Sequence, residues 1–269
     1  MDSCGAPVLF NGNSGLIDTT PGIALMVDEI YNLPCSPPSL YIDLEGVNLS
    51  RHGTLSILQI HVRTTSQNYL VDIKTLGHEA FLTPGMHSAT TVTLKSILES
   101  RTIPKVFFDV RCDSDALFSH YNIRLQGIQD LQLMEFATRQ TRKSFISGLK
   151  KCIDMDLPMT EKERRDWMTV KDDGVKLFAP EKGGSYEVFN QRPLPDKIRA
   201  YCIQDVHFLP RLWDFYNRKL SPAWRAKVAD ATEARVEQSQ GRDFNPVGKH
   251  MTLPPAGWTP HLLDYQREG

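Results

Sequence analysis

The stretch LYIDLEG at residues 40–46 decides the fold prediction. An apolar run carries the chain into Asp43 and Glu45, and Gly46 follows them. Side chains of a strand alternate between its two faces, so Asp43 and Glu45 point the same way. Two like charges side by side at the end of a buried strand repel each other and lose solvation. The pair therefore indicates that a positively charged group sits between the two carboxylates.

The segments around this strand predict a mixed α/β sheet. Strand-like runs are found at 39–45, 54–63, 68–73 and 103–110, and 125–133 contains a short fifth strand followed by another helix. The turn-rich GVNLSRHG between the first two runs can close a hairpin. The fourth run, IPKVFFDV, is nearly all apolar, as expected of a central strand covered on both faces. Three strands in succession, then strands alternating with helices, favour a five-stranded mixed sheet flanked by helices.

Helical spacing marks most of the remaining chain. Before residue 140, helices are expected at 23–33, 77–82 and 91–100, the last with Thr91 as a possible cap. Beyond residue 140, they are expected at 143–154, 160–170, 194–219 and 221–239. A Gly- and Pro-containing loop at 178–193 lies between them.

These elements predict three segments. A lead-in with one helix covers 1–36, an α/β domain covers 37–220, and a C-terminal helix with a Pro-containing tail covers 221–269. The tail has little periodicity, so it either packs on the surface or has no fixed structure.

Charge and composition limit the functions of the chain. The 269 residues are 41% hydrophobic and 23% charged, which is typical of a soluble globular protein. The formal net charge of −1 lacks the basic balance of a non-catalytic nucleic-acid binder. A nucleic-acid substrate stays possible, because bound metal ions can supply positive charge at an active site.

Cysteine usage and hydropathy bear on location. The five cysteines are scattered without a CxxC pair, which argues against a zinc site and favours a reducing compartment. No apolar run approaches the roughly 18 residues of a transmembrane helix, and the N-terminus lacks signal- and transit-peptide features. We therefore expect a cytoplasmic protein without a membrane partner, and a nuclear location stays open.

Carboxylates recur at two further places. Asp113 and Asp115 follow the central strand where a helix begins, and one acid of such a pair is often a plain N-cap. Tyr201 and Asp205 are four residues apart in a late helix, so they share one face. Each motif alone is weak evidence. Their joint appearance, in this order and on these element types, indicates an active site.

The three motifs together resemble the DEDDy 3′–5′ exonucleases of the RNase D type, which have the RNase H-like (DnaQ-like) fold. The resemblance covers about residues 37–220, with YIDLEG, KVFFDVRCDSDAL and the Tyr201–Asp205 pair as its motifs. FDVRCDSDALF and GGSYEVFN further resemble fungal exonuclease-domain proteins near the Egalitarian and exonuclease-domain-containing group. The segment 141–193 departs from the compact bacterial pattern.

The second motif leaves three candidates open. Counting without gaps to the Tyr-Asn-Ile that ends the helix favours Asp113 as the counterpart of the family's aspartate. Asp115 lies two residues further into the helix and points elsewhere. Asp109 is expected on the strand itself.

The resemblance implies a two-metal-ion hydrolase. Hard oxygen ligands select Mg²⁺ or Mn²⁺, and such ions would be the positive charge between Asp43 and Glu45. The implied metal ligands are Asp43, Glu45, Asp113 and Asp205, and the implied role of Tyr201 is to orient the attacking water. The implied product is a nucleoside 5′-monophosphate released from a 3′ end.

Substrate contacts are predicted next to the acids and in the loop at 178–193. Leu44 and Gly46 flank the acids and could let a terminal base or sugar approach, although Leu44 should point to the opposite face. The loop offers Lys182 for phosphate and Tyr186 for stacking on a base. The alternative interpretation of the loop is a flexible surface segment.

Three functions compete. The preferred one is a 3′–5′ exonuclease acting on single-stranded nucleic acid, with RNA favoured over DNA. A non-catalytic RNA-binding adaptor that keeps the fold is opposed by the complete set of acids. A phosphodiesterase specific for very short oligonucleotides fits the near-neutral charge, because long polyanions normally require a basic track. No sequence feature identifies a protein partner.

Overall fold

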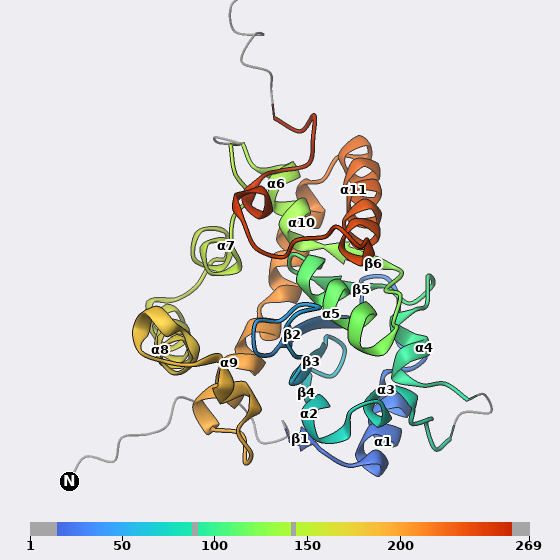
Figure 1. Cartoon of the computed structure of the whole chain (residues 1–269). Helices are drawn as coiled ribbons and strands as arrows, with labels where there is room; N and C mark the ends of the chain where they lie inside the picture. The colour runs from blue at the N-terminus through green and yellow to red at the C-terminus, as the bar shows by residue number, and fades with distance from the viewer. Residues whose placement is uncertain (1–14, 88–90, 141–143, 260–269) are drawn as a thin grey trace, which may run out of the picture.

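A single mixed sheet lies at the centre of the computed structural model (Figure 1), which describes residues 15–87, 91–140 and 144–259. In these residues the sheet has six strands in the order β1-β4-β3-β2-β5-β6. Their bounds are β1 (Leu16–Ile17), β2 (Leu40–Glu45), β3 (Ile57–Val62), β4 (Gln67–Asp72), β5 (Lys105–Phe107) and β6 (Ile128–Asp130).

The sheet combines a meander with parallel strands. β2 and β3 pair antiparallel, as do β3 and β4, whereas β5 pairs parallel with both β2 and β6. The five predicted strands are therefore confirmed. The sixth strand, β1, comes from the lead-in and pairs parallel with Leu70 and Val71 of β4. Two residues are too few to show the alternation of a strand in the sequence.

The helices follow the predicted order with some differences in their bounds. They are α1 (Thr20–Ile30), α2 (Ile73–Leu76), α3 (Glu79–Leu82), α4 (Leu94–Leu98), α5 (Arg111–Tyr121), α6 (Leu131–Thr138), α7 (Leu149–Asp156), α8 (Glu161–Phe178), α9 (Asp196–His207), α10 (Leu209–Lys219) and α11 (Pro222–Gln240). Short 3₁₀ turns lie at η1 (Pro180–Lys182), η2 (Tyr186–Asn190) and η3 (Lys249–Thr252).

Two predictions about helix ends are wrong. The single helix expected at 194–219 is split at Phe208, because Pro210 has no N–H for a continuous helix and sits in the first turn of α10. The cap of α4 is Thr93 and not Thr91. The Thr93 hydroxyl accepts from the backbone N–H of Ser96, and the Ser96 hydroxyl accepts from the N–H of Thr93.

Alternation along β2 divides the core between the two faces of the sheet. Leu40, Ile42 and Leu44 pack on one face with residues of α1, α4 and α5. Tyr41 packs on the other face with residues of α6, α7 and α10. Asp43 and Glu45 continue the face of Tyr41, so the acids point away from the cluster that holds Leu44.

The C-terminal helix packs on the α/β layers. α11 contacts α5, α6 and β6, and its buried Arg235 donates to Asp130 at 2.6 Å. Beyond α11, the Trp258 ring meets the ring of Trp224 at 5.1 Å, and Ile146 N–H donates to the carbonyl of Thr252 at 3.0 Å. The tail up to residue 259 therefore packs on the surface, and residues 260–269 lie outside the described chain.

The division at 36 and 220 stays a prediction, and residues 1–14 of the lead-in also lie outside the description. Among the residues described, no helix combines the length and apolar character needed to cross a membrane.

Candidate active site

Two elements bring three carboxylates together at the end of β2. β2 carries Asp43 and Glu45, and α9 packs against β2 and presents Asp205. One carboxylate oxygen from each of these three residues lies within 4.8 Å of the others. Tyr201 lies one helical turn before Asp205 on the same face of α9. The structure therefore assembles the first and third sequence motifs into one site.

The second motif places Asp113 on α5. It lies in the first turn of that helix and is 5% exposed. Burial raises the pKa of the Asp113 carboxyl well above its usual value, and the negative charge of Asp43 adds to the effect. The charge of Glu45 also contributes to this raised pKa, and Asp113 stays the predicted ligand from the second motif.

The other two candidates of the second motif have partners elsewhere. Asp115 accepts from the backbone N–H of Arg51 at 2.8 Å and from its Nε at 2.7 Å. Asp109 accepts from Nε and Nη2 of Arg111, each at 2.6 Å. The expectation that Asp109 lies on the strand is wrong, since β5 ends at Phe107. Asp109 occupies the following turn, with φ at +61°. Of the three, Asp113 fits the site best.

Charge crowding defines the electrostatics of the site. Burial, and then the charge of Asp205, raise the pKa of Asp43 to about 7. Burial and the charge of Asp43 hold the pKa of Glu45 well above its usual value. Converging, partly desolvated carboxylates are a donor set that suits a hard divalent cation. The residues present therefore fit such an ion.

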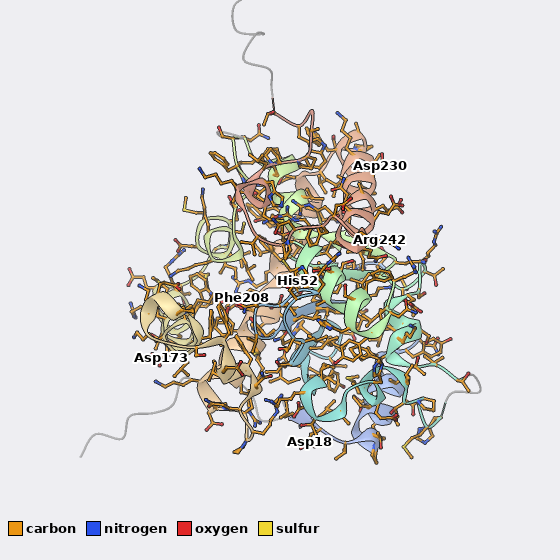
Figure 2. All side chains as sticks on the ribbon, viewed as in Figure 1. Asp18, His52, Asp173, Phe208, Asp230 and Arg242 are labelled. Atoms are coloured by element: carbon orange, nitrogen blue, oxygen red, sulfur yellow. The ribbon has the colours of Figure 1, made fainter. Side chains whose placement is uncertain are left out.

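Lys171 of α8 reaches into this site, and the sequence analysis missed it. Its Nζ donates to the two carboxylate oxygens of Asp205 at 2.7 and 2.8 Å and to the Tyr201 hydroxyl at 3.1 Å. The chain itself thus supplies one positive charge beside the acids. The neighbouring Asp173 lies on α8 at the periphery of the molecule (Figure 2).

Gly174 is the sequence signal that could have located Lys171. A Cβ at Gly174 would lie 2.4 Å from Cδ2 of Tyr201, so only glycine lets α8 approach α9 this closely. Glycine inside a helix weakens it and therefore calls for such a packing reason. Lys171 lies one turn earlier on the same face of α8.

Tyr201 is a neutral, nearly buried phenol at the site. Burial and the charge of Asp205 hold its pKa well above the usual value. Its ring meets Phe178 edge-on at 5.0 Å, and Phe178 stacks on Tyr186 at 5.9 Å. Tyr186 is therefore separated from Tyr201 by one aromatic ring.

The loop that contains Tyr186 folds back on the end of α8. Ser185 N–H donates to the carbonyl of Leu177 at 2.9 Å, and Gly184 N–H donates to the carbonyl of Ala179 at 3.0 Å. Lys182 is exposed at the end of η1. A role of Lys182 and Tyr186 in substrate binding stays a prediction.

Leu44 and Gly46 have packing explanations. The Leu44 side chain is 3% exposed and belongs to the core cluster on the face opposite the acids. A Cβ at Gly46 would lie 2.0 Å from the backbone carbonyl oxygen of Thr54, so the hairpin after β2 requires glycine there. The predicted substrate contact of Leu44 finds no support in this arrangement.

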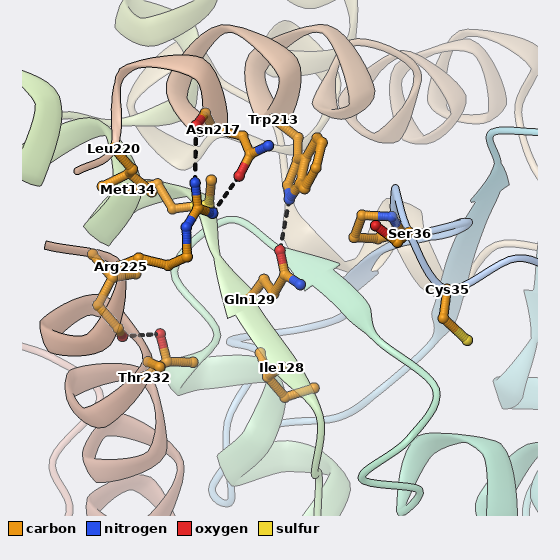
Figure 3. A pocket seen from close by; sticks show the side chains of 13 residues that line it. Cys35, Ser36, Ile128, Gln129, Met134, Trp213, Asn217, Leu220, Arg225 and Thr232 are labelled. Atoms are coloured by element: carbon orange, nitrogen blue, oxygen red, sulfur yellow. Dashed lines mark hydrogen bonds between the residues drawn. The ribbon is translucent and has the colours of Figure 1, made fainter. Parts of the chain in front are cut away.

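A separate cavity lies between β6, α10 and α11 (Figure 3). Its volume is about 350 Å³, and Trp213 Nε1 donates across it to Oε1 of Gln129 at 2.6 Å. None of the acids of the candidate site lines this cavity. It is therefore a different feature from the carboxylate cluster.

Comparison with protein families identifies the domain type. The family model described as "3'-5' exonuclease" matches residues 16–221 of the chain. The fold also matches the Trypanosoma brucei RNase D solved in complex with RNA U12, with a TM-score of 0.70 and 20% identity. That match covers 91% of this chain and 77% of the RNase D chain.

Two further proteins match over a shorter stretch or with a lower TM-score. The mouse piRNA biogenesis protein EXD1 is 40% identical over 96 residues, which are 36% of this chain and 15% of the mouse protein. Brucella melitensis NrnC with bound Mg²⁺ matches with a TM-score of 0.50 and 18% identity, over 81% of this chain and 95% of NrnC. The chain thus spans only a small part of the mouse relative.

Proposed function

Because this chain belongs to the 3′–5′ exonuclease family and has the RNase D-type fold, we propose that it is an active, metal-dependent exonuclease of the DEDDy subtype. It would remove nucleoside 5′-monophosphates from the 3′ end of single-stranded nucleic acid, with RNA favoured over DNA. The observation that carries the proposal is the convergence of Asp43, Glu45 and Asp205 within 4.8 Å.

The four acids would hold two Mg²⁺ or Mn²⁺ ions. When bound, such ions lower the pKa of water and stabilise the charge that develops on the phosphate. In this proposal Asp43, Glu45 and Asp205 are ligands from the assembled cluster, and Asp113 is a ligand from the first turn of α5. Loss of any one carboxylate would remove a ligand and a negative charge.

Tyr201 would orient the water that attacks the phosphate. Its raised pKa keeps the phenol protonated at neutral pH, so its hydroxyl can both donate and accept a hydrogen bond. Glu45 would assist by accepting a hydrogen bond from the same water. The role of Tyr201 would therefore be to position this water and not to take its proton.

The 3′-terminal nucleotide of the substrate would contact the aromatic rings beside Tyr201. Tyr186 lies next to Phe178, and a terminal base could stack on its ring. Lys182 would contact a phosphate from the exposed end of η1. The preference for RNA is supported by the RNA U12 bound to the Trypanosoma RNase D and by the piRNA-related name of EXD1.

The test is hydrolysis of 5′-labelled 20-mers, one RNA and one DNA, with Mg²⁺ or Mn²⁺. We expect a ladder that shortens from the 3′ end and that disappears with EDTA or in Asp43→Asn. Asp230→Asn is the matched control, since Asp230 is exposed on α11 (Figure 2) and should leave the ladder intact.

Two other outcomes would overturn the proposal. Binding of the RNA 20-mer without any metal-dependent cleavage would support a non-catalytic adaptor. Cleavage of a dinucleotide much faster than of five- or twenty-residue RNA would support a phosphodiesterase for very short substrates.

A further inference from the structure

Lys171 binds the carboxylate oxygens of Asp205 that the proposed metal site needs. Its Nζ lies 2.7 and 2.8 Å from the two oxygens of that carboxylate, so both oxygens are already engaged. The third contact, 3.1 Å to the Tyr201 hydroxyl, ties the same ammonium to the residue that would orient water. The Lys171 ammonium thus donates hydrogen bonds to both residues of the third motif, Tyr201 and Asp205.

The surroundings show that this contact is specific to Lys171. The two residues that follow it pair with surface lysines, Asp172 with Lys150 at 3.4 Å and Asp173 with Lys197 at 3.0 Å. The Lys171 side chain is only 12% exposed, and its ammonium lies 4.3 Å from the centre of the Tyr201 ring. Lys171 therefore points inward while its neighbours make surface ion pairs.

An ammonium and a divalent ion cannot share Asp205 without cost. Both are cations, they require the same oxygens, and their mutual repulsion is strong in a partly desolvated site. The ammonium also moves easily, because it is a compact charge on a flexible four-carbon stem. Binding of an ion at Asp205 would therefore release Lys171 and, with it, the Tyr201 hydroxyl.

We propose that Lys171 is an internal cation that competes with the divalent ion for Asp205 and so raises the metal concentration at which the site loads. The inference rests on the proposed function, since it needs the acids to bind metal. Lys171 is a positioning residue in this scheme: it keeps Asp205 and Tyr201 paired until an ion takes its place.

The first test measures Mn²⁺ binding to the full chain by the electron paramagnetic resonance signal of free Mn²⁺. Lys171→Met should bind Mn²⁺ about ten- to a hundredfold more tightly, which is the range expected from loss of a charge-assisted hydrogen bond that opposes loading. Lys171→Arg, which keeps the charge, should stay near the parent. Lys176→Met is the matched control, because Lys176 lies on the same helix and is 68% exposed.

A second test uses the unaltered protein and does not depend on the variants folding. Acetylation of lysine amines, mapped by peptide mass, should increase several-fold at Lys171 when Mn²⁺ saturates the site. Lys176 should be modified equally with and without Mn²⁺.

The outcomes separate the two proposals. If the parent binds Mn²⁺ but Lys171→Met binds it equally or more weakly, or if Mn²⁺ leaves the acetylation of Lys171 unchanged, the competition is overturned and the metal site stands. If neither protein binds Mn²⁺, the metal site itself is overturned and the competition fails with it.

Discussion

Gly174→Ala tests the close approach of α8 to Tyr201. The added Cβ would lie 2.4, 2.7 and 2.8 Å from Cδ2, Cγ and Cβ of Tyr201. Carbon atoms prefer about 3.5–4.0 Å, so Tyr201 or α8 must move by roughly 1 Å. Overpacking of this kind costs about 1–3 kcal/mol, and the better helix propensity of alanine returns about 1 kcal/mol. The free energy of unfolding should therefore fall by no more than about 2 kcal/mol.

The effect on activity should be larger than the effect on stability. A displacement of about 1 Å at a positioning group can cost roughly a hundredfold in rate, so kcat on the RNA 20-mer should fall about a hundredfold. Steady-state hydrolysis and urea denaturation measure the two quantities. Gly148→Ala is the control, because a Cβ at Gly148 meets nothing within 4 Å. Parent-like kcat together with a gain in stability would show that the contact with Gly174 does not position Tyr201.

Three further predictions follow from the charged groups. Asp113→Asn should reduce kcat about a hundredfold or more, because it removes a proposed metal ligand and its charge, with little loss of stability. Asp115→Asn should instead lower the free energy of unfolding by roughly 3 kcal/mol, because it leaves the partly buried Arg51 without its charged partner. Urea denaturation and hydrolysis rates measure both effects. A loss of activity in Asp115→Asn and a loss of stability in Asp113→Asn would contradict the choice of Asp113 as the ligand. The pKa of Asp43 is raised to about 7 and metal binds the ionised carboxylate, so Mn²⁺ affinity should increase as pH rises through about 7; a flat titration between pH 6 and 8 would count against it. Burial lowers the pKa of Lys105 from 10.5 to about 7, so between these pH values the unfolded chain binds more protons than the folded chain. The free energy of unfolding, measured by urea denaturation, should therefore rise with pH in this range. The rise should be smaller in Lys105→Met, which has no amine to titrate.

The local part of the candidate site could be predicted from the sequence. Alternation along β2 places Asp43 and Glu45 on one face, and helical spacing places Tyr201 and Asp205 on one face of α9. Both patterns depend on neighbours within a few residues, which the sequence displays directly. The preference for Asp113 within its helix rests on the same kind of counting.

Long-range packing was the part that the sequence did not reveal. Arg51 and Asp115 are 64 residues apart in the chain, and Lys171 is 34 residues from Asp205. Neither pairing has a local signature, because a charged residue on an amphipathic helix is usually solvated. The mixed charges of α8 therefore concealed the one lysine that turns inward, and only Gly174 marked the close helix contact.

In the proposed reaction, water activated at the carboxylate cluster attacks the last phosphodiester bond at the 3′ end. Hydrolysis of an RNA 20-mer in ¹⁸O-labelled water, with Mg²⁺ and mass analysis of the products, tests it most directly. The expected products are nucleoside 5′-monophosphates released one at a time from the 3′ end, each carrying one ¹⁸O on its phosphate. Nucleoside 3′-monophosphates, unlabelled products, or the same products from Asp43→Asn would contradict it.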